Sequence, residues 1–249
     1  MVALPSSRLR RTLRWLGVAL LGAGLAALLA YGFAGWFGGS PFSSLGPAVA
    51  RPGQPAVVIL SGDMGFGWGM SAKIARRLAD DGLPVVRVNS LAYFSTPRDP
   101  AATGALVGDA VERALRRAPS HRVVVIGQSF GADMLHVGLS RMAPALRVHV
   151  AAVVLVVPGA EIIFHASLPE LFELEPADVP AQPTADRLDW VRVTCVYGAE
   201  EPASLCPRLT MPNVRRVTLP GGHRLNFATD RLYRVMRQAI DAAGITHST

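Results

Sequence analysis

The sequence predicts an α/β protein with a doubly wound, mostly parallel sheet, preceded by an N-terminal transmembrane helix. Two observations carry this prediction. An uncharged segment of 22 residues lies near the N-terminus, and short β-branched runs alternate with amphipathic helical patterns through the rest of the chain. With 249 residues, half of them hydrophobic, the chain is long enough to bury one α/β core and carry an appendage.

The uncharged segment runs from Leu16 to Phe37. A helix of this length crosses a hydrocarbon core of about 30 Å, so we predict a transmembrane or signal-anchor helix over 15–37. A retained anchor is the favoured interpretation, because the segment is long for a signal peptide. Two alternatives stay open: cleavage near the Gly-Phe-Ala of 32–34 after a signal with a twin-arginine character, and a buried core helix.

Arginines set the predicted orientation of this helix. The net charge is +7, but four of these charges lie ahead of any acid, which leaves +3 for residues 15–249. The basic segment 1–14 should stay in the cytoplasm. We therefore expect a single-pass protein of the bacterial inner membrane with its folded domain in the periplasm, or a released periplasmic domain if the signal is cleaved. The remaining charge is too small, and too scattered, to indicate nucleic-acid binding.

A segment rich in Gly, Ser and Pro over 38–55 predicts a flexible linker, and the folded domain is expected over 56–249. Within it, continuous apolar strands separated by amphipathic helices indicate a parallel sheet covered on both faces. The predicted strands are 56–61, 84–89, 122–127, 148–157, 191–198 and 214–222, and the predicted helices are 68–81, 101–117, 131–142 and 231–243.

One long segment, 158–190, interrupts the alternation. It contains several prolines, seven acidic residues and one base, Arg187, and shows no clear period. An irregular insertion of this length after a strand is typical of a lid or a binding loop. A merely solvated acidic surface is the alternative.

The pentapeptide Gly-Gln-Ser-Phe-Gly of 127–131 places Ser129 between a predicted strand and a predicted helix. A sharp turn of this kind raises a serine hydroxyl above the edge of a parallel sheet, at the N-terminus of a helix. A serine hydroxyl needs an adjacent base to become nucleophilic. Of the six histidines, only His223 follows the last strand, in a loop that can fold over the serine.

The base in turn needs a carboxylate. Glu200 and Glu201 follow the strand that ends at Gly198, between Ser129 and His223 in chain order. The order serine, acid, histidine is that of an α/β-hydrolase-type fold. Glu201 is favoured because it lies deeper in the loop, but Glu200 stays open as the acid.

An oxyanion intermediate needs backbone donors. The amide of Phe130 follows the nucleophile and is the first candidate, and the second is expected from Asp63 or Met64 in the glycine-rich loop after the first strand. That loop lacks the lysine and the spacing of a phosphate-binding P-loop. No metal and no cofactor are required by this chemistry.

Two cysteines, Cys195 and Cys206, lie close together in the sequence. In an oxidising compartment such a pair can form a disulfide that holds the intervening loop. Two unpaired thiols are the alternative.

The motifs LSGDMG, VNSLAYF, GQSFGAD, CVYGAEEPASLCP and LPGGH occur in this order. Together they resemble the VirJ and AcvB family of bacterial virulence proteins, periplasmic α/β-hydrolases, over about residues 56–243. The resemblance implies a Ser129 nucleophile, a His223 base and cysteines that belong to the family pattern. The family pattern has a glycine where Met64 stands and an aspartate where Ala203 stands, which leaves the identity of the acid open.

The same resemblance implies hydrolysis of aminoacylated phosphatidylglycerol, such as the lysyl or alanyl lipid, at the outer face of the inner membrane. An aminoacyl ester carries an ammonium group, so carboxylates such as Asp63 and Asp133 are predicted to bind substrate. Two other functions remain open: a periplasmic serine esterase or peptidase with a soluble substrate, and a non-catalytic partner of secretion-system components. The sequence does not indicate an oligomeric state.

Overall fold

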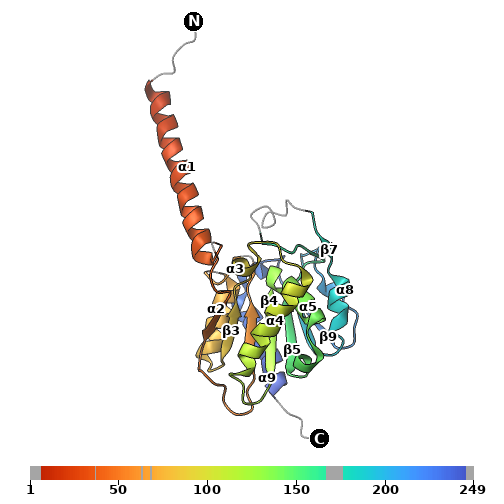
Figure 1. The fold of residues 1–249 in the computed structure, drawn as a ribbon. Coiled ribbons are helices and arrows are strands. Elements are labelled where there is room, and N and C mark those ends of the chain that lie inside the picture. Colours follow the sequence, from red (N-terminus) through yellow and green to blue (C-terminus); the bar gives the residue numbers. More distant parts are fainter. Residues whose placement is uncertain (1–6, 37, 63, 68, 167–175, 245–249) are drawn as a thin grey trace.

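A seven-stranded sheet forms the centre of the folded domain (Figure 1). The computed structural model describes residues 7–36, 38–62, 64–67, 69–166 and 176–244. The strand order is β1-β3-β2-β4-β5-β8-β9, and every neighbouring pair is parallel except β1 with β3. The strands are β1 (Phe42–Leu45), β2 (Ala56–Leu60), β3 (Val85–Val88), β4 (Val123–Gln128), β5 (Val150–Val156), β8 (Val193–Gly198) and β9 (Val214–Leu219). The predicted doubly wound, mostly parallel sheet is confirmed.

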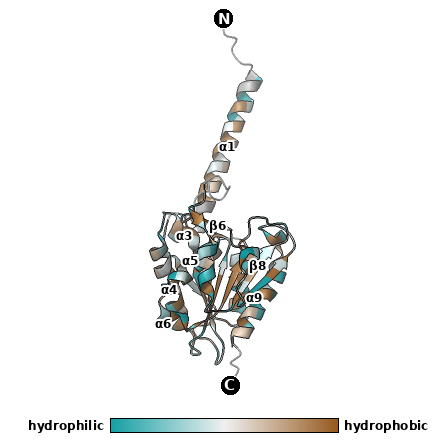
Figure 2. Cartoon of the chain, turned by 90° about the vertical axis from the view of Figure 1, so that its right-hand side faces the viewer, coloured by the Kyte–Doolittle hydropathy of each residue, from teal (hydrophilic) through white to brown (hydrophobic). Residues whose placement is uncertain are grey.

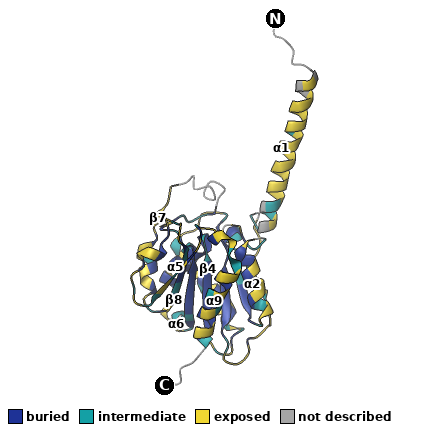
Figure 3. Ribbon diagram, turned by 180° about the vertical axis from the view of Figure 1, so that it is seen from behind, coloured by how far each residue is buried: buried dark blue, intermediate teal, exposed yellow. Residues whose placement is uncertain are grey.

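Helices cover both faces of this sheet. On one face lie α4 (Pro100–Leu115) and α5 (Phe130–Arg141), in front in Figure 1. On the other lie α2 (Met70–Asp80) and α9 (Thr229–Gly244), in front in Figure 3. Two apolar clusters result, one on each side of the sheet. Each helix and strand predicted within 56–249 is present within a few residues of its predicted range.

The apolar runs form strands because both faces of the sheet are covered. All five residues of β2 are buried, as are the first five of β4. Figure 2 shows the strands as a mainly hydrophobic layer between the helices. Each buried valine or isoleucine stabilises the fold by about 1.5–3 kcal/mol relative to an exposed one, so a continuous apolar run is most stable as a central strand.

The N-terminal helix α1 spans Ser7–Ala34 and projects from the domain. It contains a stretch, Arg11–Ala30, that is long and apolar enough to cross a membrane, as an anchor or a signal does. Its described side chains are largely exposed, as expected for a helix outside the folded domain (Figure 3). The helix begins earlier than the predicted 15–37, because arginine and leucine favour helix. It ends earlier because Gly35 has a φ of +108°.

The prediction of a flexible linker over 38–55 is wrong. Residues Phe42–Leu45 form the edge strand β1, which pairs antiparallel with β3. The Arg117 guanidinium donates hydrogen bonds to the carbonyl oxygens of Leu45 and Pro47, at 3.2 and 2.7 Å. An edge strand needs a partner on one side only and shows little apolar periodicity, so its composition resembled that of a linker.

Shorter elements connect this framework. The insertion 158–190 is less irregular than predicted in its described parts, since it contains a two-stranded sheet of β6 and β7. Residues 167–175, which include three of its seven acidic residues, lie outside the described residues. The short elements are α3 (Ser90–Phe94), α6 (Pro144–Arg147), β6 (Glu161–Ile162), β7 (Val179–Pro180), α8 (Gln182–Ala185) and the 3-10 turns η1 (Asp186–Leu188), η2 (Cys206–Arg208) and η3 (Leu225–Phe227).

Candidate active site

Ser129 sits on a strained turn at the carboxyl end of β4, directly before α5. Its backbone has φ 53° and ψ −129°, a conformation that L-residues rarely adopt. The flanking glycines make this turn possible. A Cβ on Gly127 would lie 2.4 Å from the carbonyl oxygen of Gly131, and one on Gly131 would lie 2.2 Å from that of Ser61. The turn therefore excludes side chains at both positions and presents the serine hydroxyl above the sheet.

His223 lies within hydrogen-bond distance of this hydroxyl. Its Nε2 is 2.7 Å from Ser129 Oγ, although the two residues are 94 positions apart in the chain. The contact that the sequence predicted between them is present. His223 follows β9 and is half exposed, so a substrate can approach the pair from solvent.

Glu201 lies on the other side of the imidazole. Its Oε1 is 2.5 Å from His223 Nδ1, and its side chain is only 8% exposed. Glu200 instead has an exposed side chain, while its backbone amide donates to the carbonyl oxygen of Gly221 at 3.0 Å. The carboxylate in contact with the imidazole is therefore that of Glu201, and Nδ1 carries the proton that Glu201 accepts. Nε2 is then free of a proton and can accept the one from Ser129.

The loops that carry Glu201 and His223 are held against each other. A Cβ on Gly198 would lie 2.3 Å from the carbonyl oxygens of both Gly221 and Gly222. The loop after β8 and the loop after β9 thus approach with no room for a side chain between them. This close approach sets the distance between acid and base.

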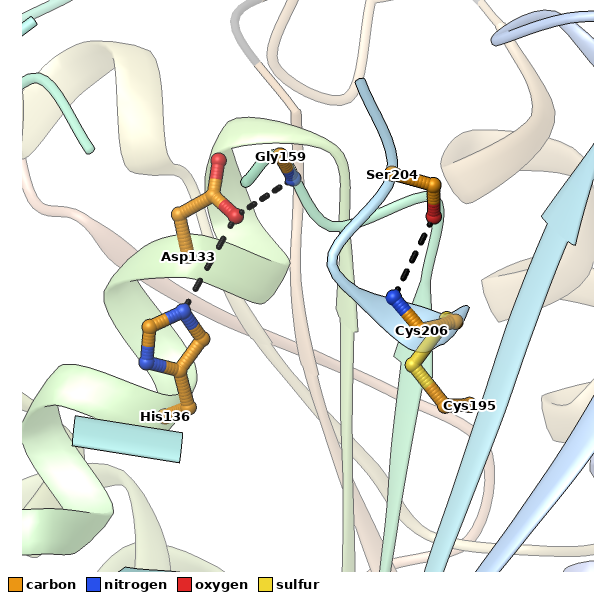
Figure 4. The surroundings of a disulfide bond; sticks show 6 residues. All are labelled: Asp133, His136, Gly159, Cys195, Ser204 and Cys206. Atoms are coloured by element: carbon orange, nitrogen blue, oxygen red, sulfur yellow. Dashed lines mark hydrogen bonds and ion pairs between the residues drawn. A yellow bond between two sulfur atoms is a disulfide. The ribbon is translucent and has the colours of Figure 1, made fainter. Parts of the chain in front are cut away.

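A disulfide closes the loop of Glu201. Cys195 in β8 is bonded to Cys206, with a Cα–Cα distance of 5.5 Å (Figure 4). The insertion also holds this loop. Ser204 forms an isolated antiparallel β-bridge with Gly159, and the Leu205 amide donates a hydrogen bond to the carbonyl oxygen of Pro158 at 3.0 Å. Of the two alternatives for the cysteines, the structure has the disulfide.

One candidate backbone donor for an oxyanion, the Phe130 amide, lies next to Ser129. Phe130 occupies the first turn of α5, where amide groups have no partner within the helix. The loop after β2 runs alongside, since a Cβ on Gly62 would lie 3.5 Å from Ser129 Cβ. Met64 follows in this loop and is partly exposed, whereas Asp63 lies outside the described residues. The part of the chain that the structure describes contains no group of three or more His, Cys, Asp or Glu placed to hold a metal ion.

Asp133 is mostly buried and holds a neighbouring loop. Its Oδ1 accepts a hydrogen bond from the Gly159 amide at 3.0 Å and lies 4.0 Å from Nε2 of His136 (Figure 4). Its side chain is 13% exposed. This carboxylate is already used in holding the loop after β5, which argues against the predicted contact with the substrate ammonium.

His136 is a buried histidine that the sequence did not single out. Its Nδ1 lies 2.9 Å from Thr184 Oγ1, and the threonine hydroxyl donates to the carbonyl oxygen of Ala181. Nδ1 must therefore donate its proton to Thr184. Burial lowers the pKa of His136 to about 3, so the ring is neutral in the folded protein.

This buried ring predicts acid sensitivity of the fold. The unfolded state binds a proton at His136 below about pH 6.5 and the folded state does not, so the free energy of unfolding falls as the pH drops from about 6.5 toward 3. Between pH 7 and pH 5 the expected loss is about 2 kcal/mol, measured by urea unfolding. His136→Asn should remove most of this loss, whereas His121→Asn, at an exposed histidine with positive φ, should keep it. If wild type and His136→Asn lost the same free energy of unfolding between pH 7 and pH 5, the acid sensitivity would not come from His136.

Comparison with known proteins gives a family and a fold. The sequence profile of a family described as "Bacterial virulence protein (VirJ)" matches residues 55–243, well over half of the chain. The comparison with curated protein sequences found no match.

Similar solved structures are numerous and distant. Proline iminopeptidase of Mycobacterium smegmatis has a TM-score of 0.55 and 18% identity, covering 82% of this chain and 94% of its own. Est1E of Butyrivibrio proteoclasticus has a TM-score of 0.53 and 16% identity, covering 80% and 93%. The thioesterase domain from the curacin biosynthetic pathway has a TM-score of 0.50 and 17% identity, covering 79% and 94%. At these identities the similarity establishes the α/β-hydrolase fold.

Proposed function

The chain belongs to the VirJ family of bacterial virulence proteins, and from this premise we propose that it is a serine hydrolase that cleaves the aminoacyl ester of aminoacylated phosphatidylglycerol. The observation that carries the proposal is the hydrogen-bonded series from Ser129 through His223 to Glu201, which follow the carboxyl ends of β4, β9 and β8. Nucleophile, base and acid in this arrangement are the groups that acyl transfer requires.

In the first step, Ser129 Oγ attacks the carbonyl carbon of the aminoacyl ester. His223 Nε2 accepts the hydroxyl proton, and the Glu201 carboxylate stabilises the imidazolium cation that forms. The negative oxygen of the tetrahedral intermediate faces the Phe130 amide and the loop that contains Met64. The bond to the glycerol oxygen then breaks, and phosphatidylglycerol leaves with the proton from His223.

In the second step, water attacks the acyl group on Ser129. His223 takes a proton from this water and returns one to the serine oxygen as the bond to the acyl carbon breaks. The products are the free amino acid and the restored enzyme. Water is the only co-reactant.

Two features support an aminoacyl lipid as the substrate. The ester bears an ammonium group, and Glu200, which precedes the acid Glu201 in the same loop, has an exposed carboxylate that attracts a cation. The helix α1 provides a membrane anchor, which raises the effective concentration of the domain at lipid headgroups. The arginines in the first turns of α1 precede its uncharged segment, which favours a domain on the periplasmic side of the inner membrane, where a disulfide is stable.

The test is a comparison of membrane lipids by thin-layer chromatography. Deletion of the gene is expected to raise the level of aminoacyl-phosphatidylglycerol, and a wild-type copy should lower it again. A Ser129→Ala copy, matched in expression, should not lower it. Purified protein should also release the amino acid from defined lysyl and alanyl lipids.

Each remaining outcome counts against the proposal in a different way. Restoration of the lipid profile by Ser129→Ala would exclude both enzymatic functions and favour a secretion-system partner. Unchanged lipids, together with Ser129-dependent hydrolysis of a soluble ester, would favour an esterase with a soluble substrate.

A further inference from the structure

The helix α1 joins the folded domain at the edge of the sheet that carries Ser129. The Asn89 amide, at the carboxyl end of β3, donates to the carbonyl oxygen of Pro41 at 2.8 Å. A Cβ on Gly35 would lie 2.6 Å from Asn89 Nδ2 and 3.3 Å from Ala92 Cβ, and Trp36 packs against the apolar core. Direct contacts with the domain therefore begin one residue after α1 ends.

These contacts bring the domain close to the predicted membrane surface. The candidate span Arg11–Ala30 ends at Ala30, and the uncharged segment ends at Phe37. Gly35 therefore lies at most five residues beyond the span, about 7 Å along a helix axis. The headgroup layer on one side of a bilayer is about 5–8 Å thick. A flexible linker over 38–55 would instead give a root-mean-square span of about 23 Å. The docked helix thus holds this edge of the domain at headgroup depth.

Ser129 lies only a short distance, measured across the strands, from the point where α1 joins the domain. It follows β4, which is separated from β3 by β2 alone. Two strand spacings amount to about 10 Å. Because the parallel strands end at the same edge, the serine and the membrane junction lie on the same side of the molecule, from which α1 rises in Figures 1, 2 and 3.

Several exposed residues of this edge suit a lipid surface. Met64, in the loop after β2, is 41% exposed, and Phe227, beyond β9, is 67% exposed. Arg98 and Arg224 are exposed in loops of the same edge. Exposed aromatic and arginine side chains interact favourably with the interface and with anionic headgroups. We define the bilayer face as Met64, Arg98, Arg224 and Phe227.

The short helix α3 links this face to the insertion. Its beginning contacts the junction with α1 through Asn89 and Ala92. At its end, the Phe94 carbonyl oxygen accepts a hydrogen bond from the Ala166 amide at 2.7 Å, and the Arg98 amide donates to the carbonyl oxygen of Phe164 at 3.1 Å. The insertion, the anchor and the serine are thus attached at one edge of the sheet.

We propose that the bilayer face rests on the leaflet surface of the membrane that α1 spans, so that Ser129 reaches the ester of a lipid that stays in that membrane. This inference rests on the proposed function for its substrate, but the docking itself is independent of catalysis. The protein then acts on lipids of its own membrane and not on lipids of other vesicles.

Fluorescent labelling tests the docking. Both native cysteines are in the disulfide, so a single new cysteine can be labelled with an environment-sensitive fluorophore in the full-length protein, reconstituted in phosphatidylglycerol vesicles. Phe227→Cys is the test position. Val148→Cys is the matched control, because Val148 is 79% exposed but precedes β5 at the opposite edge. Spin-labelled lipids should quench the probe at 227 at least about threefold more than the probe at 148. Equal quenching would overturn the proposal.

Hydrolysis in mixed vesicles separates this inference from the proposed function. Substrate lipid in the vesicles that hold the protein should be cleaved at least about tenfold faster than the same lipid in protein-free vesicles. A 15-residue Gly-Ser insertion between Ala34 and Gly35 separates α1 from the residues that contact the domain. It should reduce this preference, while turnover of a soluble short-chain ester stays unchanged. If the uninterrupted protein cleaves substrate lipid at equal rates in both vesicle populations and still cleaves the soluble ester, the docking proposal is wrong and the proposed function is unaffected. No cleavage of any ester would count against the proposed function, with the quenching result unaffected.

Discussion

Ser129→Ala is expected to lower kcat/KM for ester hydrolysis by about 10³–10⁶-fold, because the variant has no nucleophile while the backbone donors remain. The Ser129 hydroxyl is the group 2.7 Å from His223 Nε2. The measurement is the initial rate of the purified full-length protein with a soluble ester. Ser120→Ala is the control, since Ser120 precedes β4, at the opposite edge of the sheet from Ser129, and its hydroxyl donates to the Gln54 carbonyl oxygen.

A double variant makes this test sharper. If Ser129 and His223 act as one unit, adding His223→Ala to Ser129→Ala should lower the rate no further, because residues of a catalytic unit are strongly non-additive. Additive losses would show that the two groups act independently. A rate for Ser129→Ala within threefold of wild type would exclude Ser129 as the nucleophile.

Glu201→Gln is expected to lower kcat by about 10²–10⁴-fold. Glutamine keeps the shape of the side chain but offers an amide donor as well as an acceptor and has no charge, so the imidazole loses the carboxylate that selects its tautomer and stabilises its cation. The present contact is the 2.5 Å pair of Glu201 Oε1 and His223 Nδ1. Rates with the soluble ester measure the effect.

Glu200→Gln is the matched control for this prediction. It changes the neighbouring carboxylate, which is exposed, and should leave kcat within about threefold of wild type. With a cationic aminoacyl ester it should instead raise KM, because the substrate ammonium loses an attractive charge. A large fall in kcat for Glu200→Gln, with little change for Glu201→Gln, would reverse the assignment.

Local patterns were sufficient to predict most elements of the fold. The strands β2, β4 and β5 are continuous apolar runs, and such runs are stable only where helices cover both faces of a sheet. The turn at Ser129 was also predictable from a local pattern, because the two glycines flank the serine directly after an apolar run. In the structure, Gly127 and Gly131 leave no room for a side chain. The edge strand Phe42–Leu45 was missed, because pairing on one side imposes little pattern.

The sequence alone determined which chemical groups are available and the order in which strands and helices follow one another, because residue type and hydrophobic period are local properties. Only the tertiary structure decided that Glu201 and not Glu200 contacts the imidazole and that Asp133 accepts a hydrogen bond from the Gly159 amide. It also decided that the residue after α1 packs against Asn89, at the carboxyl end of β3. Each of these depends on how two loops distant in sequence approach each other. That approach is set by sheet order and packing, which a single stretch of sequence does not contain.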